Sequence, residues 1–139
     1  MAVFQQTIRL KTRGDCHVMD ITPDVNLVVA ASHLKHGIVN ISGVGSTLGI
    51  TTTEYEPGCI ADLQRALDQI APPTDDYSHN ARWNDDNGYS HLRSSLIGTA
   101  KSFPLYDGKL AIGQWQQVVV CDFDSRPRER QVVVTIVGE

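Results

Sequence analysis

Two segments with helical spacing lie among segments that are rich in β-favouring residues and joined by short turns. The first is expected over residues 23 to about 36, because Pro23 suits the first position of a helix and Gly37 suits its end. The second is expected over residues 57–70, where apolar residues keep helical spacing until Pro72-Pro73. Because strands outnumber helices and pair locally, the sequence predicts the α+β class.

The β-favouring segments alternate with turn signals along the chain. Strands are expected over residues 3–10, 16–20, 38–41, 50–55, 101–106, 110–123 and 131–137. Asp107-Gly108 is typical of a tight hairpin turn. A short helix over residues 90–96, capped by Ser90 and closed by Gly98, is also expected. We therefore predict one domain over residues 1–139, with a mostly antiparallel mixed sheet packed against two main helices.

The composition is that of an ordinary globular protein. The chain has 139 residues, of which 41% are hydrophobic and 20% charged, which is enough for one domain with a real core. A net charge of -4 argues against a general nucleic-acid binder, which is usually basic. Because the sequence contains no apolar run long enough for a bilayer and no signal-peptide pattern, we expect no membrane partner and a cytoplasmic location.

The three cysteines are far apart in the sequence. Cys16, Cys59 and Cys121 form no Cys-x-x-Cys pair, and their number is odd. A disulfide framework or a cysteine-based zinc site is therefore not expected. Free cysteines are usually buried, and we expect three reduced thiols.

Residues 77–91 hold two histidines, adjacent carboxylates, an arginine and three aromatic residues, with almost no aliphatic side chain. Imidazole and carboxylate are common ligands of divalent metals and common groups for proton transfer. His79 and His91 flank Asp85 and Asp86, so a folded loop can bring them together. We predict that His79, His91 and Asp85 form a catalytic site or bind zinc or magnesium. The alternative is a surface loop of solvated polar groups.

Three other segments carry candidate ligand-binding residues. Ser46 and Thr47 lie in a glycine-rich segment that can cradle a phosphate, although a tight turn is the alternative. Trp115 with Gln116 can stack on a planar ring and read its edge, or can simply pack against the sheet. Arg128, which lies between two further arginines, can clamp a phosphate, or can belong to a charged hairpin end.

These motifs together resemble the YjbQ-like family of small proteins, often described as secondary thiamine-phosphate synthases. The resemblance covers nearly the whole chain, in the same order. The matching segments are Gly45-Ser46-Thr47, Ile50-Thr51-Thr52, Glu54-Tyr55-Glu56-Pro57-Gly58, Tyr77-Ser78-His79-Asn80, Asp85-Asp86-Asn87-Gly88, Ser90-His91-Leu92-Arg93-Ser94-Ser95-Leu96-Ile97-Gly98, Gly108-Lys109-Leu110, Gly113-Gln114-Trp115-Gln116 and residues 122–130.

The resemblance implies a compact α+β domain that assembles as a homotrimer, with sites near subunit boundaries. It also implies synthesis of thiamine phosphate from a pyrimidine diphosphate and a thiazole phosphate, so that the partner is a small phosphorylated heterocycle. By position, His79, His91 and Asp85 fall in the family's polar site motif. The residues that match its other recurrent motifs are Ser46, Thr47, Trp115 and Gln116.

The chain departs from the family pattern at two positions. Gly45 stands where many members have a histidine, and Gln114 stands where many have a threonine. A third ligand or donor of those members is therefore absent here. Two other functions stay open: metal-dependent hydrolysis at a histidine–carboxylate site, and a non-catalytic trimer that binds a metabolite or an anion.

Overall fold

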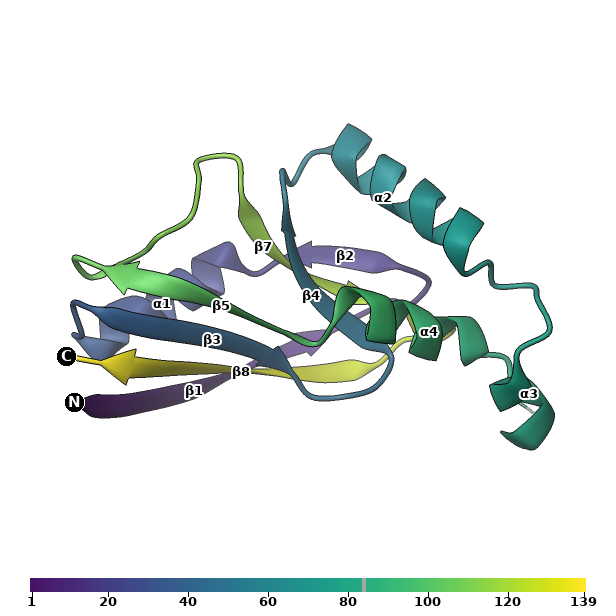
Figure 1. Ribbon diagram of the computed structural model, residues 1–139, viewed down its shortest axis with the longest axis horizontal. Coiled ribbons are helices and arrows are strands. Elements are labelled where there is room, and N and C mark those ends of the chain that lie inside the picture. The colour runs from purple at the N-terminus through teal and green to yellow at the C-terminus, as the bar shows by residue number, and fades with distance from the viewer. Residues whose placement is uncertain (84) are drawn as a thin grey trace.

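Five strands form one antiparallel sheet and three strands form a second in the computed structural model, which describes residues 1–83 and 85–139 (Figure 1). The strands are β1 (Ala2–Lys11), β2 (His17–Asp20), β3 (Gly37–Gly43), β4 (Leu48–Thr53), β5 (Ala100–Tyr106), β6 (Lys109–Leu110), β7 (Gln117–Asp122) and β8 (Glu129–Gly138). The helices are α1 (Thr22–Ser32), α2 (Pro57–Ile70), α3 (Ser78–Trp83) and α4 (Gly88–Ile97). The predicted α+β class is confirmed.

The larger sheet has the strand order β1-β8-β3-β5-β6, and the smaller has the order β2-β7-β4. Helix α1 lies behind the larger sheet in Figure 1 and contacts β1, β6 and β8. Helix α4 lies against β4, while α2 runs along the upper right and α3 extends at the lower right. The two ends of the chain lie together, because Ala2 pairs with Gly138. The face of the larger sheet that points away from α1 is not covered by any described element.

Strand β7 is buried on both faces, which explains its unbroken apolar run. Val118 and Val120 point into the main core, which also contains α1 and the inner face of the larger sheet. Val119 and Cys121 alternate with them and point into a second core beneath α2. The smaller sheet is therefore a middle layer between the larger sheet and the helices α2 and α4.

Helix α4 is fixed to the smaller sheet by polar anchors rather than by an apolar face alone. Ser90 donates a hydrogen bond to the carbonyl of Phe123, and Ser94 donates one to the carbonyl of Leu48 at 2.6 Å. Arg93, almost fully buried, donates from Nε and Nη2 to the carbonyl of Ala71, at the end of α2. These bonds hold α4, and with it His91, in a defined position.

Several predicted boundaries are wrong. Helix α1 ends at Ser32, because His33 adopts the left-handed conformation with φ 57° and terminates it. The predicted strand over residues 110–123 is two strands, β6 and β7, separated by a loop that holds Trp115. The loop over residues 77–91 contains α3, and α4 begins at Gly88 because the Ser90 side chain bonds the sheet instead of capping the helix. In the described residues, the two main helices and the short helix expected near residues 90–96 are therefore joined by one that was not expected, α3.

Two further expectations concern the whole chain. Cys16 and Cys121 are buried and Cys59 is half-buried, and all three are free thiols, as expected. No helix in the described part of the chain combines the length and the apolar character needed to span a bilayer. Asn84, which falls in the predicted polar segment, lies outside the described residues.

Candidate functional site

The two histidines of the polar segment are in contact. His79 lies in α3 and His91 in the first turns of α4, and their ring centroids are 4.3 Å apart at an angle of 48°. The Nε2 atom of His79 is 3.0 Å from Asp85 Oδ1 and 3.0 Å from Asn87 Oδ1. The structure therefore brings together the three residues predicted to act as a unit, His79, His91 and Asp85.

The connection between α3 and α4 is held by local hydrogen bonds. The backbone N–H of Gly88 donates to Asn80 Oδ1 at 2.9 Å. A Cβ atom at position 88 would lie 2.5 Å from the Cβ of Tyr77, so only glycine fits this close approach. The phenol of Tyr77 donates to the carbonyl of Pro72 at 2.6 Å, which ties the segment to the end of α2. The sequence thus folds the two histidines toward each other.

The surroundings of His91 favour its neutral form. Burial lowers the pKa of the His91 imidazole below its usual 6.5, and the neighbouring His79 lowers it further. The carboxylates of Asp124 and Asp85 act in the opposite direction without cancelling this shift. No hydrogen bond from a described residue engages the ring nitrogens of His91. A neutral imidazole with an available nitrogen can accept a proton or coordinate a metal.

Asn87 links the histidines to a buried ion network. Its amide Nδ2 donates to Asp124 Oδ1 over 3.4 Å, while its Oδ1 faces His79. Asp124, which is 1% exposed, also accepts from Thr47 Oγ1 at 3.1 Å and from Arg128 Nε at 2.8 Å. Burial raises the pKa of Asp124, but the bond from Ser125 N–H and the charge of Arg128 hold the pKa below its usual value.

A second buried pair lies next to Asp124. Arg130 donates from Nε to Asp122 Oδ2 at 2.7 Å and from Nη2 to Asp122 Oδ1 at 2.8 Å, and Thr12 also donates to Asp122. Nη2 of Arg130 reaches Thr47 Oγ1 at 2.6 Å. Such two-bond contacts are among the strongest in proteins. This pair fixes the start of β8 against β7 and the turn before β4.

The predicted ligand-binding residues are divided between two places. Thr47 and Arg128 join the histidines through Asp124, but their polar atoms are already engaged there, and Ser46 is exposed in the adjoining turn. The loop that holds Trp115 lies at the top of Figure 1, on the opposite side of the molecule from α3. Within one chain, Trp115 lines a hollow to which no residue of α3 contributes.

The Trp115 loop borders a separate small hollow. Trp115 is 66% exposed, and the amide of Gln116 is used to fix the loop, by accepting from Gly113 N–H at 2.9 Å and donating to Thr52 Oγ1 at 3.3 Å. The hollow beside it has a volume of about 400 Å³. Its lining residues are Asp20, Glu54, Tyr55, Glu56, Gln114, Trp115 and Gln117. Three carboxylates and two aromatic rings therefore meet there.

A hollow of about 460 Å³ adjoins the histidine site and shares Asp85 with it. Its lining residues are Asp75, Asp76, Tyr77, Ser78, Asn80, Ala81, Asp85 and Asp86. Because four of these are carboxylates and none is basic, the field in this hollow favours a cationic or neutral ligand over a phosphorylated one.

The metal prediction is neither confirmed nor contradicted. In residues 1–83 and 85–139, no group of three or more His, Cys, Asp or Glu side chains is arranged to hold a metal ion. Zinc or magnesium at His79, His91 and Asp85 stays a prediction, and so do the ligand-binding roles of Ser46, Thr47, Trp115, Gln116 and Arg128.

Two site residues were missed by the sequence reasoning. Asn87 contacts His79, and Asp124 is the carboxylate that connects Asn87 to the arginines. Asn87 was hidden in the polar segment, because an amide next to two aspartates has no distinctive pattern. Asp124 lies 33 positions after His91 in the sequence, and only the pairing of α4 with the end of β7 through Ser90 brings it near. The only sequence signal for Asp124 was the alternation Asp122-Phe123-Asp124, in which two carboxylates flank an apolar residue that is expected to be buried.

The fold and the histidine site together define an α+β domain of the YjbQ kind. The sequence model of the family described as UPF0047 protein YjbQ-like matches residues 6–139. Because this match covers nearly all of the sequence, the chain belongs to the UPF0047 family, as the resemblance predicted.

Relatives with similar sequences and structures carry the same description. The UPF0047 protein of Methanothermobacter thermautotrophicus is 32% identical over 139 residues, which are 100% of this chain and 95% of that protein. YugU of Bacillus subtilis, also a UPF0047 protein, is 28% identical over 96% of this chain and 98% of its own. A crystal structure of a YbjQ-like protein of unknown function from Sulfolobus solfataricus matches with a TM-score of 0.95 and 32% identity, covering 99% of both chains.

The expected thiamine-phosphate synthase activity is wrong on these comparisons. The matching family and relatives are described only as UPF0047 proteins, the Sulfolobus solfataricus protein is described as one of unknown function, and none is described as a synthase. The geometry agrees with this correction, because the acidic hollow disfavours a phosphorylated ligand and Trp115 lies away from the histidines.

Proposed function

We propose that the chain is an enzyme in which His91 exchanges a proton with a small neutral or cationic substrate. The observation that carries the proposal is the contact between a neutral His91 and a His79 ring that is oriented by Asp85 and Asn87. An imidazole whose pKa is lowered below 6.5 is largely unprotonated at pH 7 and can act as a base.

The neighbours of His91 suit both halves of a proton-transfer cycle. The unprotonated ring accepts a proton from the substrate, and the imidazolium that forms is stabilised by the carboxylates of Asp124 and Asp85. Asp85 and Asn87 hold the His79 ring in place, so that the pair keeps its geometry when the charge changes. The acidic hollow beside the pair supports a substrate without a negative charge.

The test uses hydrolysis of p-nitrophenyl acetate, a general probe of reactive imidazoles. We expect a rate that rises through a pKa below 6.5 and is lost at least fivefold in His91→Gln. The matched control is His36→Gln, since His36 is an exposed imidazole outside the site. Equal rates in wild type and His91→Gln would contradict the proposal.

A second candidate function is binding of a divalent cation by the same residues. Its specific support is the donor set, because Asp85 and Asn87 oxygens both lie 3.0 Å from His79 Nε2 and four carboxylates line the adjoining hollow. Ligand atoms about 2.1 Å from one octahedral ion lie roughly 3 Å from each other. When bound, the ion would supply Lewis-acid chemistry, and His79, Asp85 and His91 would hold it.

Titration calorimetry of protein made without an affinity tag tests this candidate. With zinc and magnesium supplied separately, we expect about one ion per chain and at least tenfold weaker binding in a His79→Gln, His91→Gln double variant. Equal binding by the double variant and the wild type would exclude these residues as ligands. Catalysis without metal dependence would leave the proton-transfer function as the sole one.

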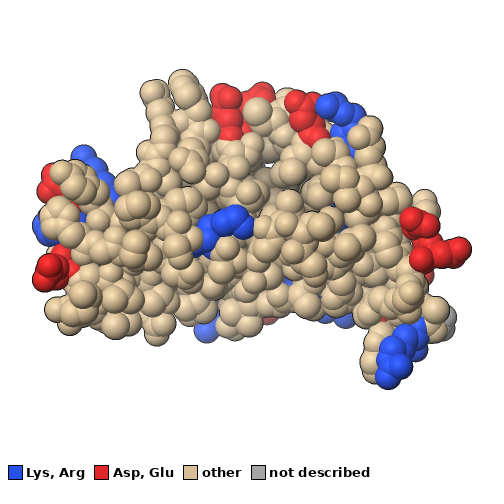
Figure 2. All heavy atoms as spheres, viewed as in Figure 1, with Lys and Arg blue, Asp and Glu red and all other residues tan. Residues whose placement is uncertain are grey.

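Self-association, expected as a homotrimer, is also proposed, and the open face of the larger sheet supports it. This face is nearly free of charge across three rows of side chains that the strand register aligns. The rows are Val3, Val137, Ile38 and Pro104; Gln5, Thr135, Asn40 and Ser102; and Thr7, Val133, Ser42 and Ala100. In Figure 2 the charged groups lie mainly along the margins of this view. Depletion of charge is typical of the cores of subunit interfaces.

Light scattering coupled to gel filtration measures the assembly. A wild-type mass of three chains and a single-chain mass for Ile38→Glu are expected, since Ile38 is 50% exposed at the centre of the apolar row. Leu27→Glu, on the exposed side of α1, is the control and should keep the wild-type mass. A monomeric wild-type protein would contradict the trimer.

The cytoplasmic location stays a prediction.

A further inference from the structure

A hollow at the junction of β1 and β8 has a charge opposite to that of the chain as a whole. It measures about 360 Å³ and lies where three register pairs close the end of the sheet: Arg9 with Gln131, Leu10 with Arg130, and Lys11 with Glu129. Three of its six lining residues are cations and one is an anion, in a chain with a net charge of -4. A local cluster of positive charge on an acidic protein favours an anionic ligand.

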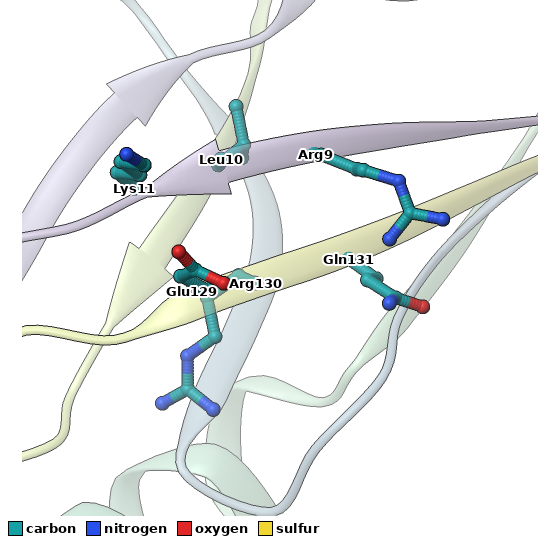
Figure 3. A pocket seen from close by; sticks show the side chains of 6 residues that line it. All are labelled: Arg9, Leu10, Lys11, Glu129, Arg130 and Gln131. Atoms are coloured by element: carbon teal, nitrogen blue, oxygen red, sulfur yellow. The ribbon is translucent and has the colours of Figure 1, made fainter.

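The side chains that line this hollow come from two neighbouring strands (Figure 3). Arg9 and Gln131 extend side by side from neighbouring strands, so that the guanidinium and the amide face the same space. Lys11 is two residues beyond Arg9 and therefore projects from the same face of the sheet, roughly 7 Å away along the strand. A guanidinium fork, an amide N–H₂ and an ammonium are the donors that bind phosphate oxygens.

These donors are available. The ion pairs found among residues 1–83 and 85–139 involve neither Arg9 nor Lys11. Arg130, by contrast, is turned to the inner face and held by Asp122, so that it contributes its field to the hollow but not its donors at Nε and Nη2. Arg9 and Lys11 thus lie on the accessible face of the sheet, and Arg130, which is held by Asp122, lies on the inner face behind them.

We propose that Arg9, Lys11 and Gln131 form an anion site that binds a phosphate group, separate from the histidine pair. Charged residues on an edge strand also discourage pairing with other sheets, and that role alone would account for exposed charges on β1. It would not account for a hollow with an arginine and an amide directed at the same space.

The experiment is a titration of the full-length protein with inorganic phosphate, followed by amide and side-chain NMR. Chloride is adjusted so that the ionic strength stays constant. We expect saturable shifts confined to Arg9, Lys11 and Gln131 and their neighbours. The concentration for half-saturation should rise at least fivefold in Arg9→Gln, and it should fall in Glu129→Gln because the only carboxylate of the hollow is removed. A parallel titration with methyl phosphate distinguishes a site for phosphate esters from one for the free ion, according to which binds more tightly.

The matched control is Arg65→Gln, which removes one exposed arginine from the far side of α2. Its half-saturation should equal that of the wild type. Shifts that never saturate, or an equal weakening in Arg9→Gln and Arg65→Gln, would show that phosphate responds only to overall charge and would overturn the proposal. All of these side chains are exposed, so the variants should fold; an unchanged spectrum outside the hollow checks this.

Discussion

The histidine pair, which was predicted from the sequence, and the Asp122–Arg130 pair, which was not, occupy opposite environments. Asp122 and Arg130 are buried and hold each other through two hydrogen bonds, with Thr12 and Thr47 completing the set. His79 and His91 are half-buried, and His91 keeps a nitrogen that no described residue engages. Complete pairing marks the Asp122–Arg130 pair as a structural element, and the available ring nitrogen of His91 marks the histidine pair as the reactive one.

The largest effect should come from breaking the structural pair. Asp122→Ala leaves the Arg130 guanidinium buried without its carboxylate, and such a change typically costs about 3–5 kcal/mol. Urea unfolding at pH 7 measures the loss. Asp62→Ala, which removes one partner of an exposed pair with Arg65, should cost roughly 0–1 kcal/mol. If the two variants lost equal stability, the Asp122–Arg130 pair would not have the structural role given to it.

A substitution in the connection below the histidines should have the next largest effect. A Cβ at position 88 would meet Tyr77 Cβ at 2.5 Å and Asn80 Oδ1 at 2.9 Å, so Gly88→Ala must displace α3. Overpacking of this kind typically costs about 1–3 kcal/mol. Because α3 carries His79, the displacement should also change the NMR signals of His79 and His91.

Gly113→Ala is the matched control, since the nearest atom to a Cβ there is 3.7 Å away. It should leave the histidine signals unchanged. Unaltered histidine signals in Gly88→Ala would mean that the position of α3 does not depend on the close approach at Gly88.

Acid should weaken the structural pair more than the histidine pair. Burial alone would raise the pKa of Asp122, but hydrogen bonds from Arg130 and Thr12 hold its pKa below the usual 3.8. A carboxyl with a depressed pKa stabilises the fold fully above its unfolded value and loses this contribution as the pH falls through its folded value. Stability should therefore fall below about pH 4, and less steeply in Asp122→Asn, as urea midpoints between pH 2 and 6 will show.

Much of the fold follows from local patterns, and the site does not. The apolar spacing of α2, the Asp107-Gly108 turn and the run of valines in β7 each reflect one element and its neighbours, so the sequence indicated them. The end of α1 depends on a left-handed His33, which no residue pattern signals. The split of the strand predicted over residues 110–123 depends on a hydrogen bond that the Gln116 side chain accepts from Gly113 N–H and one that the Gln117 side chain donates to the carbonyl of Gln114.

The site depends on tertiary packing that the sequence does not reveal. His79 and His91 were recognised as a pair because they lie in one short segment. The arginines were interpreted as a phosphate clamp because the sequence did not show where their carboxylate partners lie. Arg130 is buried and paired with Asp122, so it has a structural role instead of binding a ligand. The sequence could not show that Trp115, a candidate ligand-binding residue, lines a hollow of its own.

The smallest effect, and the most direct test of the reactive pair, is the response of the His91 pKa to its two kinds of neighbour. His79 lowers this pKa and Asp85 raises it, so His79→Gln should raise the value and Asp85→Asn should lower it. NMR titration of the imidazole signals between pH 4 and 9 measures both shifts, with the exposed His36 as the internal reference that neither variant should move. Because the pKa is lower in the folded state than in the unfolded chain, the neutral ring contributes stability fully above about pH 6.5, and this contribution is lost as the pH falls below that value and through the lower folded pKa. Shifts of the same sign in the two variants would mean that the pKa of His91 responds to burial alone. The difference between the Asp122–Arg130 pair and the histidine pair would then rest on geometry only.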